Sequence, residues 1–455
     1  MLIWLILIFF IIFLIYRRIS KRDHFAHIDP KIPRVTSNGF WGNVSDWDPR
    51  NPLRTQIENT LIYGSIYVHR ELFNTEVQIS DPVLTREVLR KCPNRPVSHN
   101  VLKYLFGTNS IFLVRDNDWQ KLRTKLETVF RRVNLDTFLP ITIQCTQDFI
   151  SKWRNFSSKA SVDMDRELIE LSITVIARTL FSQQSLTGVI KHVNGLVNAV
   201  TYVLGNPVRL LDLRNPYQIY KCQHEIREYF RKIRREHKAM EGKTDIVTSL
   251  VDYDPETVVD QMMSFFYAGH DTVGHTLAWT LYEVSMRPDV QEKILKEVDS
   301  IKEINRETIG NVEGGLKYLN SVIREVLRLH PPASVQDREV PEDMEIGGYH
   351  FTKGTDIRIN LWSMHLNAEY WPDPHRFSPE RWNDVVNIDA SWLPFNTGPR
   401  VCIGRDFALQ ELRVALCLIY RAFTFTHDTL HIVGPESKFT TLPTEGLHLW
   451  IHKRT

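Results

Sequence analysis

The stretch Phe395-Asn396-Thr397-Gly398-Pro399-Arg400-Val401-Cys402-Ile403-Gly404 places one cysteine in a loop of turn-forming residues near the C-terminus. Apolar residues at helical spacing follow it and predict an amphipathic helix. Backbone N–H groups and the positive end of that helix favour a thiolate over a thiol at Cys402. Gly398 and Gly404 let the backbone approach a flat molecule closely, and Arg400 offers a cation to a carboxylate. Together these groups suit an iron porphyrin with propionates.

A buried structural cysteine in a Gly/Pro loop is the alternative interpretation. The coincidence of several positions argues against it, because the stretch resembles the haem-ligand signature of the cytochrome P450 superfamily, Phe-x-x-Gly-x-Arg-x-Cys-x-Gly, without a departure. The resemblance implies that Cys402 is the axial ligand of a haem b iron. It also implies cofactor-binding roles for Phe395, Arg400 and Gly404.

Composition limits the remaining possibilities. The 455 residues carry a formal charge of +2, so nothing indicates a nucleic-acid partner. The 11 Trp, 15 Tyr and 23 Phe favour large apolar interiors or pockets. The five cysteines are scattered and form no CxxC pair, so neither a disulfide framework nor a zinc site is indicated, and a reducing compartment is expected.

The N-terminus is apolar from Met1 to Tyr16 and is followed by Arg17 and Arg18. We interpret residues 1–19 as a transmembrane signal anchor, because basic residues on its C-terminal side hold that side in the cytosol. A cleaved signal peptide is the alternative. Residues 20–45 are expected to form a linker, and residues 46–455 a haem-thiolate monooxygenase domain. The predicted location is the endoplasmic reticulum membrane, with one N-terminal span and a cytosolic catalytic domain.

Trp119 and Arg123 lie four residues apart and share a face of a predicted helix. A core tryptophan beside a surface arginine is the ordinary explanation. The superfamily resemblance implies instead that this helix lies beside the haem and that the pair reaches a propionate.

A long helix is predicted from Asp254-Pro255-Glu256 to just before Pro288, since Asp254 suits an N-cap and Pro255 the first helical position. A glycine at its centre costs about 1 kcal/mol relative to alanine, so Gly269 needs a reason. One possible reason is close packing against another helix. The alternative reason is functional, since Ala268-Gly269-His270-Asp271-Thr272 resembles the superfamily's oxygen-activation motif. This resemblance implies that Ala268 and Gly269 adjoin the cofactor and that Asp271 and Thr272 are catalytic and deliver protons. The Thr272 hydroxyl is expected to bond the Ala268 carbonyl and to loosen the helix.

An ion pair of Glu325 with Arg328 is predicted on a further helix, and its apolar flanks indicate burial. The resemblance implies a structural triad with Arg381 of the Pro379-Glu380-Arg381 segment. It also implies that Arg338 offers another cation to a propionate.

In chain order, these motifs imply the mainly α fold of the superfamily, a triangular helical prism around a buried haem with small β-sheets. The implied reaction inserts one oxygen atom of O2 into an apolar substrate, with electrons from NADPH through NADPH–cytochrome P450 reductase and with cytochrome b5 as a second candidate donor. The cysteine loop is most similar to fatty-acid and alkane hydroxylating members. Oxidation of a sterol, terpenoid or xenobiotic, a haem-thiolate isomerase or dehydratase, and a non-enzymatic haem sensor remain alternatives. An apolar pocket is expected beside Phe265, Phe266, Val273 and Thr276.

Overall fold

A computed structural model describes residues 25, 27–36, 43, 52–71, 74–96, 102–156, 160–204, 214–238, 244–310, 315–383, 390–431, 433–437 and 440–454. The chain forms two compact units. Unit 1 comprises Met1–Pro96, Val335–Met364 and Thr397–Pro399, and unit 2 comprises Val97–Ser334, His365–Asn396 and Arg400–Thr455.

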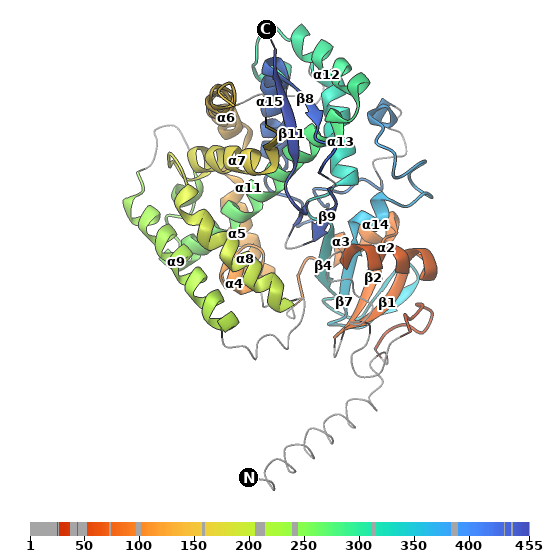
Figure 1. The fold of residues 1–455 in the computed structure, drawn as a ribbon. Helices are drawn as coiled ribbons and strands as arrows, with labels where there is room; N and C mark the ends of the chain where they lie inside the picture. Colours follow the sequence, from red (N-terminus) through yellow and green to blue (C-terminus); the bar gives the residue numbers. More distant parts are fainter. Residues whose placement is uncertain are drawn as a thin grey trace, which may run out of the picture. The chain divides into compact units, whose positions relative to one another are not determined.

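Unit 1 is built on a four-stranded sheet in the order β1-β2-β7-β4 (Figure 1). Strand β2 pairs antiparallel with β1 and parallel with β7, and β4 pairs antiparallel with β7. A separate hairpin joins β5 to β6. Asp81 caps helix α3 by accepting a bond from the Leu84 backbone, and Pro82 follows as the first helical residue. The elements are α2 Pro52–Tyr63, β1 Ile66–Glu71, β2 Asn74–Ile79, α3 Pro82–Lys91, β4 Val335–Glu339, β5 Met344–Ile346, β6 Tyr349–Phe351, β7 Asp356–Asn360 and α14 Leu361–His365, whose last residue belongs to unit 2.

Part of the segment expected to be a linker packs onto this unit. Ile28, Ile32 and Val35 are buried. The Val35 backbone N–H donates to Val68 O of β1, and Ile28 forms a β-bridge with Phe351. These three apolar residues therefore contribute to the core of unit 1.

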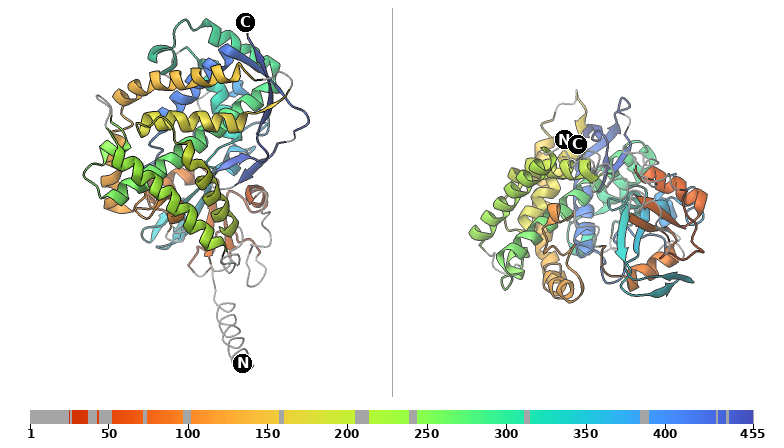
Figure 2. Two further views of the ribbon diagram at one scale, coloured as in Figure 1. Left: turned by 60° about the vertical axis from the view of Figure 1, so that its left-hand side comes forward. Right: turned by 90° about the horizontal axis from the view of Figure 1, so that it is seen from below.

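Unit 2 is mostly helical, as Figure 2 shows. Its helices are α4 Lys103–Phe106, α5 Asp116–Glu127, α6 Arg132–Trp153, α7 Met164–Leu180, η4 Thr187–Val189, α8 Ile190–Leu204, α9 Arg214–Glu236, α10 Ile246–Ser249, α11 Pro255–Ser285, α12 Pro288–Ser300, η6 Arg306–Gly310, α13 Lys317–Leu329, η7 Pro379–Asn383 and α15 Arg405–Ala422. Two small sheets complete it, in the orders β3-β11-β8 and β10-β9. Their strands are β3 Val162–Asp163, β8 Phe423–His427, β9 Pro435–Ser437, β10 Thr441–Pro443 and β11 His448–Lys453. The prediction of a mainly α fold with small sheets is confirmed.

Helix α11 passes through the core of unit 2, and almost all of its side chains from Thr257 onward are buried. Asp254 accepts bonds from the Glu256 and Thr257 backbones, and Pro255 opens the helix as expected from the sequence. The helix packs along α7. At Gly274 a Cβ would lie 2.9 Å from the Ile169 Cα, so only glycine permits this approach of the two backbones.

The predicted anchor at residues 1–19 lies outside the described residues. Within the described ranges, no helix combines the length and apolar character needed to cross a membrane.

Candidate active site

The cysteine loop is closed by a backbone bond in which the Cys402 N–H donates to Phe395 O at 2.9 Å. Asn396 adopts a positive φ of 67° at the turn. Helix α15 begins three residues after the cysteine, with Gly404 as its N-cap residue. The predicted arrangement of a sulfur just before a helix N-terminus is therefore present.

The sulfur environment differs from the expectation in one respect. Burial raises the pKa of the Cys402 thiol, although the Gly404 backbone N–H and the Arg123 and Arg405 guanidiniums act in the opposite direction. The helix terminus and the two guanidiniums favour the thiolate, as expected, but desolvation outweighs them in the protein alone. Cys402 is an exposed residue, whereas the other four cysteines are buried. A metal ion bound by the sulfur would stabilise the thiolate directly.

Arg400 is fixed by three contacts within unit 2. Its Nη1 donates to Ile111 O and its Nη2 to Val114 O, each at 2.9 Å. Its guanidinium lies 4.2 Å from the centre of the Trp119 ring. These contacts tie the cysteine loop to the segment that leads into α5.

Arg123 also contacts the loop, but through the backbone. Its Nη1 donates to Val401 O at 2.9 Å, while its Nε pairs with Glu127 at 2.6 Å. Trp119 and Arg123 thus both act on the residues around Cys402, one through Arg400 and the other through a carbonyl.

Arg338 lies on β4 of unit 1 and is 1% exposed. Its Nη1 bonds the Asp337 carbonyl, and its Nε and Nη2 have no hydrogen-bond partner in the described part of the chain. Burial lowers its pKa to about 9, and the charge of Arg95 adds to this effect. A buried guanidinium with two such nitrogens can bond an anion, and a porphyrin propionate is one. Each taken by itself, the Cys402 thiol suits a haem iron and the Arg338 guanidinium suits a propionate.

The central turn of α11 carries the predicted oxygen-activation residues. The Thr272 hydroxyl donates to Ala268 O at 2.8 Å, as expected. Helix α11 is nevertheless continuous from Pro255 to Ser285, so this bond does not interrupt it. A Cβ on Gly269 would lie 2.4 Å from the Ile176 Cδ1, so the space at this glycine is occupied by α7, as the close-packing alternative requires.

Asp271 is held on both sides. Its Oδ1 lies 3.4 Å from His275 Nε2, and its Oδ2 accepts a bond from the Thr440 hydroxyl. Burial alone would raise the pKa of Asp271, but the charge of His275 outweighs burial and holds the pKa below its usual value. Asp271 is therefore ionised at neutral pH.

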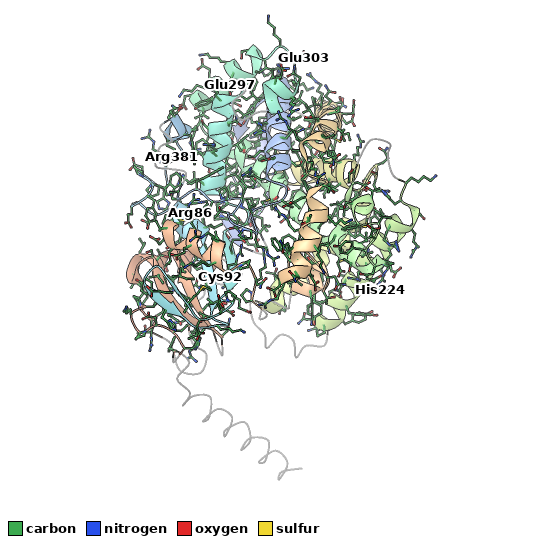
Figure 3. All side chains as sticks on the ribbon, turned by 180° about the vertical axis from the view of Figure 1, so that it is seen from behind. Arg86, Cys92, His224, Glu297, Glu303 and Arg381 are labelled. Carbon is green, nitrogen blue, oxygen red and sulfur yellow. The ribbon has the colours of Figure 1, made fainter. Side chains whose placement is uncertain are left out.

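Glu325, Arg328 and Arg381 meet in the interior of unit 2. Glu325 and Arg328 are both fully buried and are joined by two bonds of 2.8 and 3.0 Å. Arg381 Nε donates to Glu325 Oε1 at 2.9 Å; its position is labelled in Figure 3. The Ser378 backbone and the Trp382 indole also donate to the same carboxylate. The carboxylate is thus fully paired, as a buried charge requires.

Two of the expected pocket residues make aromatic contacts in the core. Phe266 lies edge-on to Phe230 of α9 at 5.7 Å, and Phe265 stacks on Phe130 at 5.5 Å. Val273 and Thr276 are buried as well.

Comparison with known proteins decides the family. The cytochrome P450 family model matches residues 32–449. The chain belongs to the cytochrome P450 family. It is therefore a haem-thiolate monooxygenase, an oxidoreductase that binds haem through a cysteine thiolate and uses dioxygen with reducing equivalents.

Its similarity to individual P450 relatives is distant and extends over most of each chain. Cytochrome P450 CYP72A616 of Paris polyphylla is 26% identical over 83% of this chain and 79% of its own length. The 7-deoxyloganic acid hydroxylase of Catharanthus roseus is 26% identical over 83% and 80%. Thromboxane-A synthase of Macaca fascicularis is 26% identical over 91% and 89%.

Sequence reasoning missed His275 and Thr440, which contact Asp271, and Asp165, which contacts His275. His275 stands four residues after Asp271 on the same helix, so its proximity was readable from helical spacing. Asp165 and Thr440 are more than 100 residues away from it in sequence, and no local signal marks them.

Proposed function

We propose that Cys402 is the haem ligand of this P450 and that the enzyme hydroxylates an apolar, fatty-acid-like lipid. The observation that carries the assignment is the position of Cys402. It is an exposed cysteine in the loop from Phe395 to Gly404, which is closed by the bond from Cys402 N–H to Phe395 O. Within unit 2 the loop is held by Trp119, Arg123 and Arg400. A haem bound in this way supplies the activation of dioxygen that the reaction needs.

Within this proposal the α11 residues manage protons. Asp271 is an ionised carboxylate on the turn that carries the Thr272 hydroxyl, so the pair can accept a proton and pass it on. Glu325, Arg328 and Arg381 have a structural role. The acid–alcohol pair favours a monooxygenase over a haem-thiolate isomerase or dehydratase, which rearranges a hydroperoxide without consuming dioxygen and needs no such supply.

The apolar substrate is supported by the cysteine loop's similarity to fatty-acid hydroxylating members. The relatives' names do not narrow the class of substrate, since one relative is a 7-deoxyloganic acid hydroxylase and another is a thromboxane-A synthase. The test is titration of the purified protein with a panel of fatty acids, sterols and terpenoids, following the shift of the Soret band. Product analysis with NADPH and reductase follows for each compound that binds. A shift and a hydroxylated product only with sterols or terpenoids would overturn the lipid assignment.

We further propose that residues 1–19 anchor the protein in the endoplasmic reticulum membrane. The basic residues after them would then keep the catalytic body in the cytosol, where NADPH–cytochrome P450 reductase supplies electrons and cytochrome b5 is a second candidate donor. Carbonate extraction of membranes with and without residues 1–19 tests the anchor. Release of the full chain by carbonate would contradict it.

A further inference from the structure

His275 of α11 lies between two carboxylates. Its Nδ1 is 2.7 Å from Asp165 Oδ1 on α7, and its Nε2 is 3.4 Å from Asp271 Oδ1 on its own helix. The imidazole is 4% exposed, whereas the Asp165 and Asp271 side chains retain 14% and 22%. Both ring nitrogens of a buried histidine thus face an acid that solvent can still reach.

The contact depends on the close packing of α11 on α7. Gly274, next to His275, allows the two helix backbones to meet at Ile169, four residues after Asp165. Asp165 itself lies in the first turn of α7, where its backbone N–H donates to the N-cap Asp163. A glycine, which is less favourable than alanine inside a helix, therefore stands beside this histidine.

The charges around the ring favour its protonated form. Burial opposes the charge, but Asp165 and Asp271 outweigh it and raise the pKa of His275 to about 10. His270 and Tyr267 of α11 are also titratable and interact with Asp271. The Nδ1 of His270 contacts Phe266 O at 2.6 Å, and burial lowers the pKa of His270 and raises that of Tyr267. Thr440, which precedes β10, bonds the second oxygen of Asp271. The cation at His275 therefore has a carboxylate on each side and a neutral neighbour.

We propose that His275 is a positioning residue that conducts protons from Asp165 to Asp271. The inference rests on the proposed role of Asp271 and Thr272. The imidazolium releases its Nε2 proton to Asp271 and keeps the proton on Nδ1. The ring then turns over, so that Nδ1–H faces Asp271 and the bare Nε2 faces Asp165, through which a solvent proton reaches it. One proton enters for each that leaves, and no electrons move.

The decisive variants separate proton conduction from charge. His275→Arg keeps a cation with several N–H groups, but a guanidinium does not release its proton at ordinary pH. Asp165→Asn removes the outer acid and leaves His275 and Asp271 in place. His270→Gln is the matched control, because it replaces a buried histidine of the same helix that bonds a backbone carbonyl.

Each variant is purified with haem, and its ferrous–CO spectrum, NADPH consumption, peroxide and product are measured. We expect unchanged spectra in all three. Product formed per NADPH should fall about tenfold in His275→Arg and Asp165→Asn, less than the 100-fold or more typical of a group that acts on the reacting atoms, and should stay at the wild-type value in His270→Gln. Full coupling in His275→Arg would mean that His275 is only a counter-ion, and full coupling in Asp165→Asn would place the proton source elsewhere. Either result overturns the proposal.

A second measurement does not depend on turnover. Because the pKa of His275 is raised from 6.5 to about 10, its stabilising charge is fully present below about pH 6.5 and is lost as the pH rises through about 10. The difference in unfolding temperature between wild type and His275→Gln should therefore shrink as the pH rises from 6 to 10. A difference that does not change with pH shows a packing role and contradicts the proposal, even if a variant above fails to fold. If coupling is lost in Thr272→Ala but not in the His275 variants, the relay through His275 is rejected and the proposed role of Asp271 and Thr272 is retained. If coupling is complete in Thr272→Ala and in the His275 variants, both the relay and that role are rejected.

Discussion

The Arg400 guanidinium lies over the ring of Trp119, 4.2 Å from its centre. Such a contact contributes about 0.5–2 kcal/mol, depending on how well it is desolvated. Because the same guanidinium bonds the Ile111 and Val114 carbonyls, it fastens the residue two positions before Cys402 to the chain that enters α5. The residues next to Cys402 are therefore held by contacts within unit 2.

Replacing Cys402 by serine should abolish the strongly red-shifted Soret band of the ferrous–CO complex, because a hydroxyl cannot provide the thiolate ligand. Cys92→Ala, at a buried cysteine of unit 1 labelled in Figure 3, is the control and should keep the band. Absorption spectra of the two purified variants are the measurement. A normal band in Cys402→Ser would refute the ligand assignment.

Thr272→Ala should keep the haem spectrum and divert NADPH electrons into peroxide, because it removes the hydroxyl bonded to Ala268 O at the centre of α11. Thr280→Ala is a matched control, since Thr280 makes the same type of bond to Thr276 O on the same helix. Peroxide and product per NADPH are measured for both. Equal coupling in the two variants would show that the Thr272 hydroxyl only satisfies a helix carbonyl.

Arg328→Ala should yield haem-free, aggregated protein. Removing one member of a buried ion pair costs about 3–5 kcal/mol, since Glu325 and Arg381 keep their charges without a full set of partners. Arg54→Ala breaks an exposed pair with Glu58, in which both side chains are more than half accessible, and should change stability by about 1 kcal/mol at most. Soluble yield and haem content are compared. A soluble Arg328→Ala protein with normal haem content would contradict a stabilising triad.

Local patterns predicted local structure well. Asp254 and Pro255 mark the start of α11 because capping depends on neighbouring residues alone. The Thr272 bond to Ala268 and the Glu325–Arg328 pair likewise follow from helical spacing.

Contacts between distant segments were not readable in the same way. The expected propionate pair of Trp119 and Arg123 also holds the cysteine loop, through Arg400 and the Val401 carbonyl. At Cys402 the helix end is visible in the sequence, whereas the desolvation that raises the pKa of the thiol depends on the whole surrounding fold.

Four basic residues are expected to guide electron transfer. Lys121, Lys125, Arg131 and Arg132 are all exposed on α5, α6 and the turn between them, and Arg123 of the same helix contacts Val401 of the cysteine loop. A cationic surface near that loop would attract an acidic flavoprotein. Lys125 is partly neutralised by Asp252 at 3.3 Å, so Lys121 should contribute more.

Neutralising both lysines, as Lys121→Gln with Lys125→Gln, should slow reduction by NADPH–cytochrome P450 reductase mainly at low ionic strength. Exposed charges are screened as salt rises, with a Debye length of about 10 Å at 0.1 M. Turnover driven by added peroxide should not change, because it bypasses the reductase. Lys191→Gln, at an exposed position on α8, is the control for lost surface charge. An equal loss of both activities would point to damage at the haem site, and no loss in either would show that these lysines only keep α5 soluble. If the variant remained slower than wild type by the same factor at every salt concentration, docking through these charges would also be contradicted. Attraction between exposed charges must weaken in wild type as the salt concentration increases, so the difference should shrink.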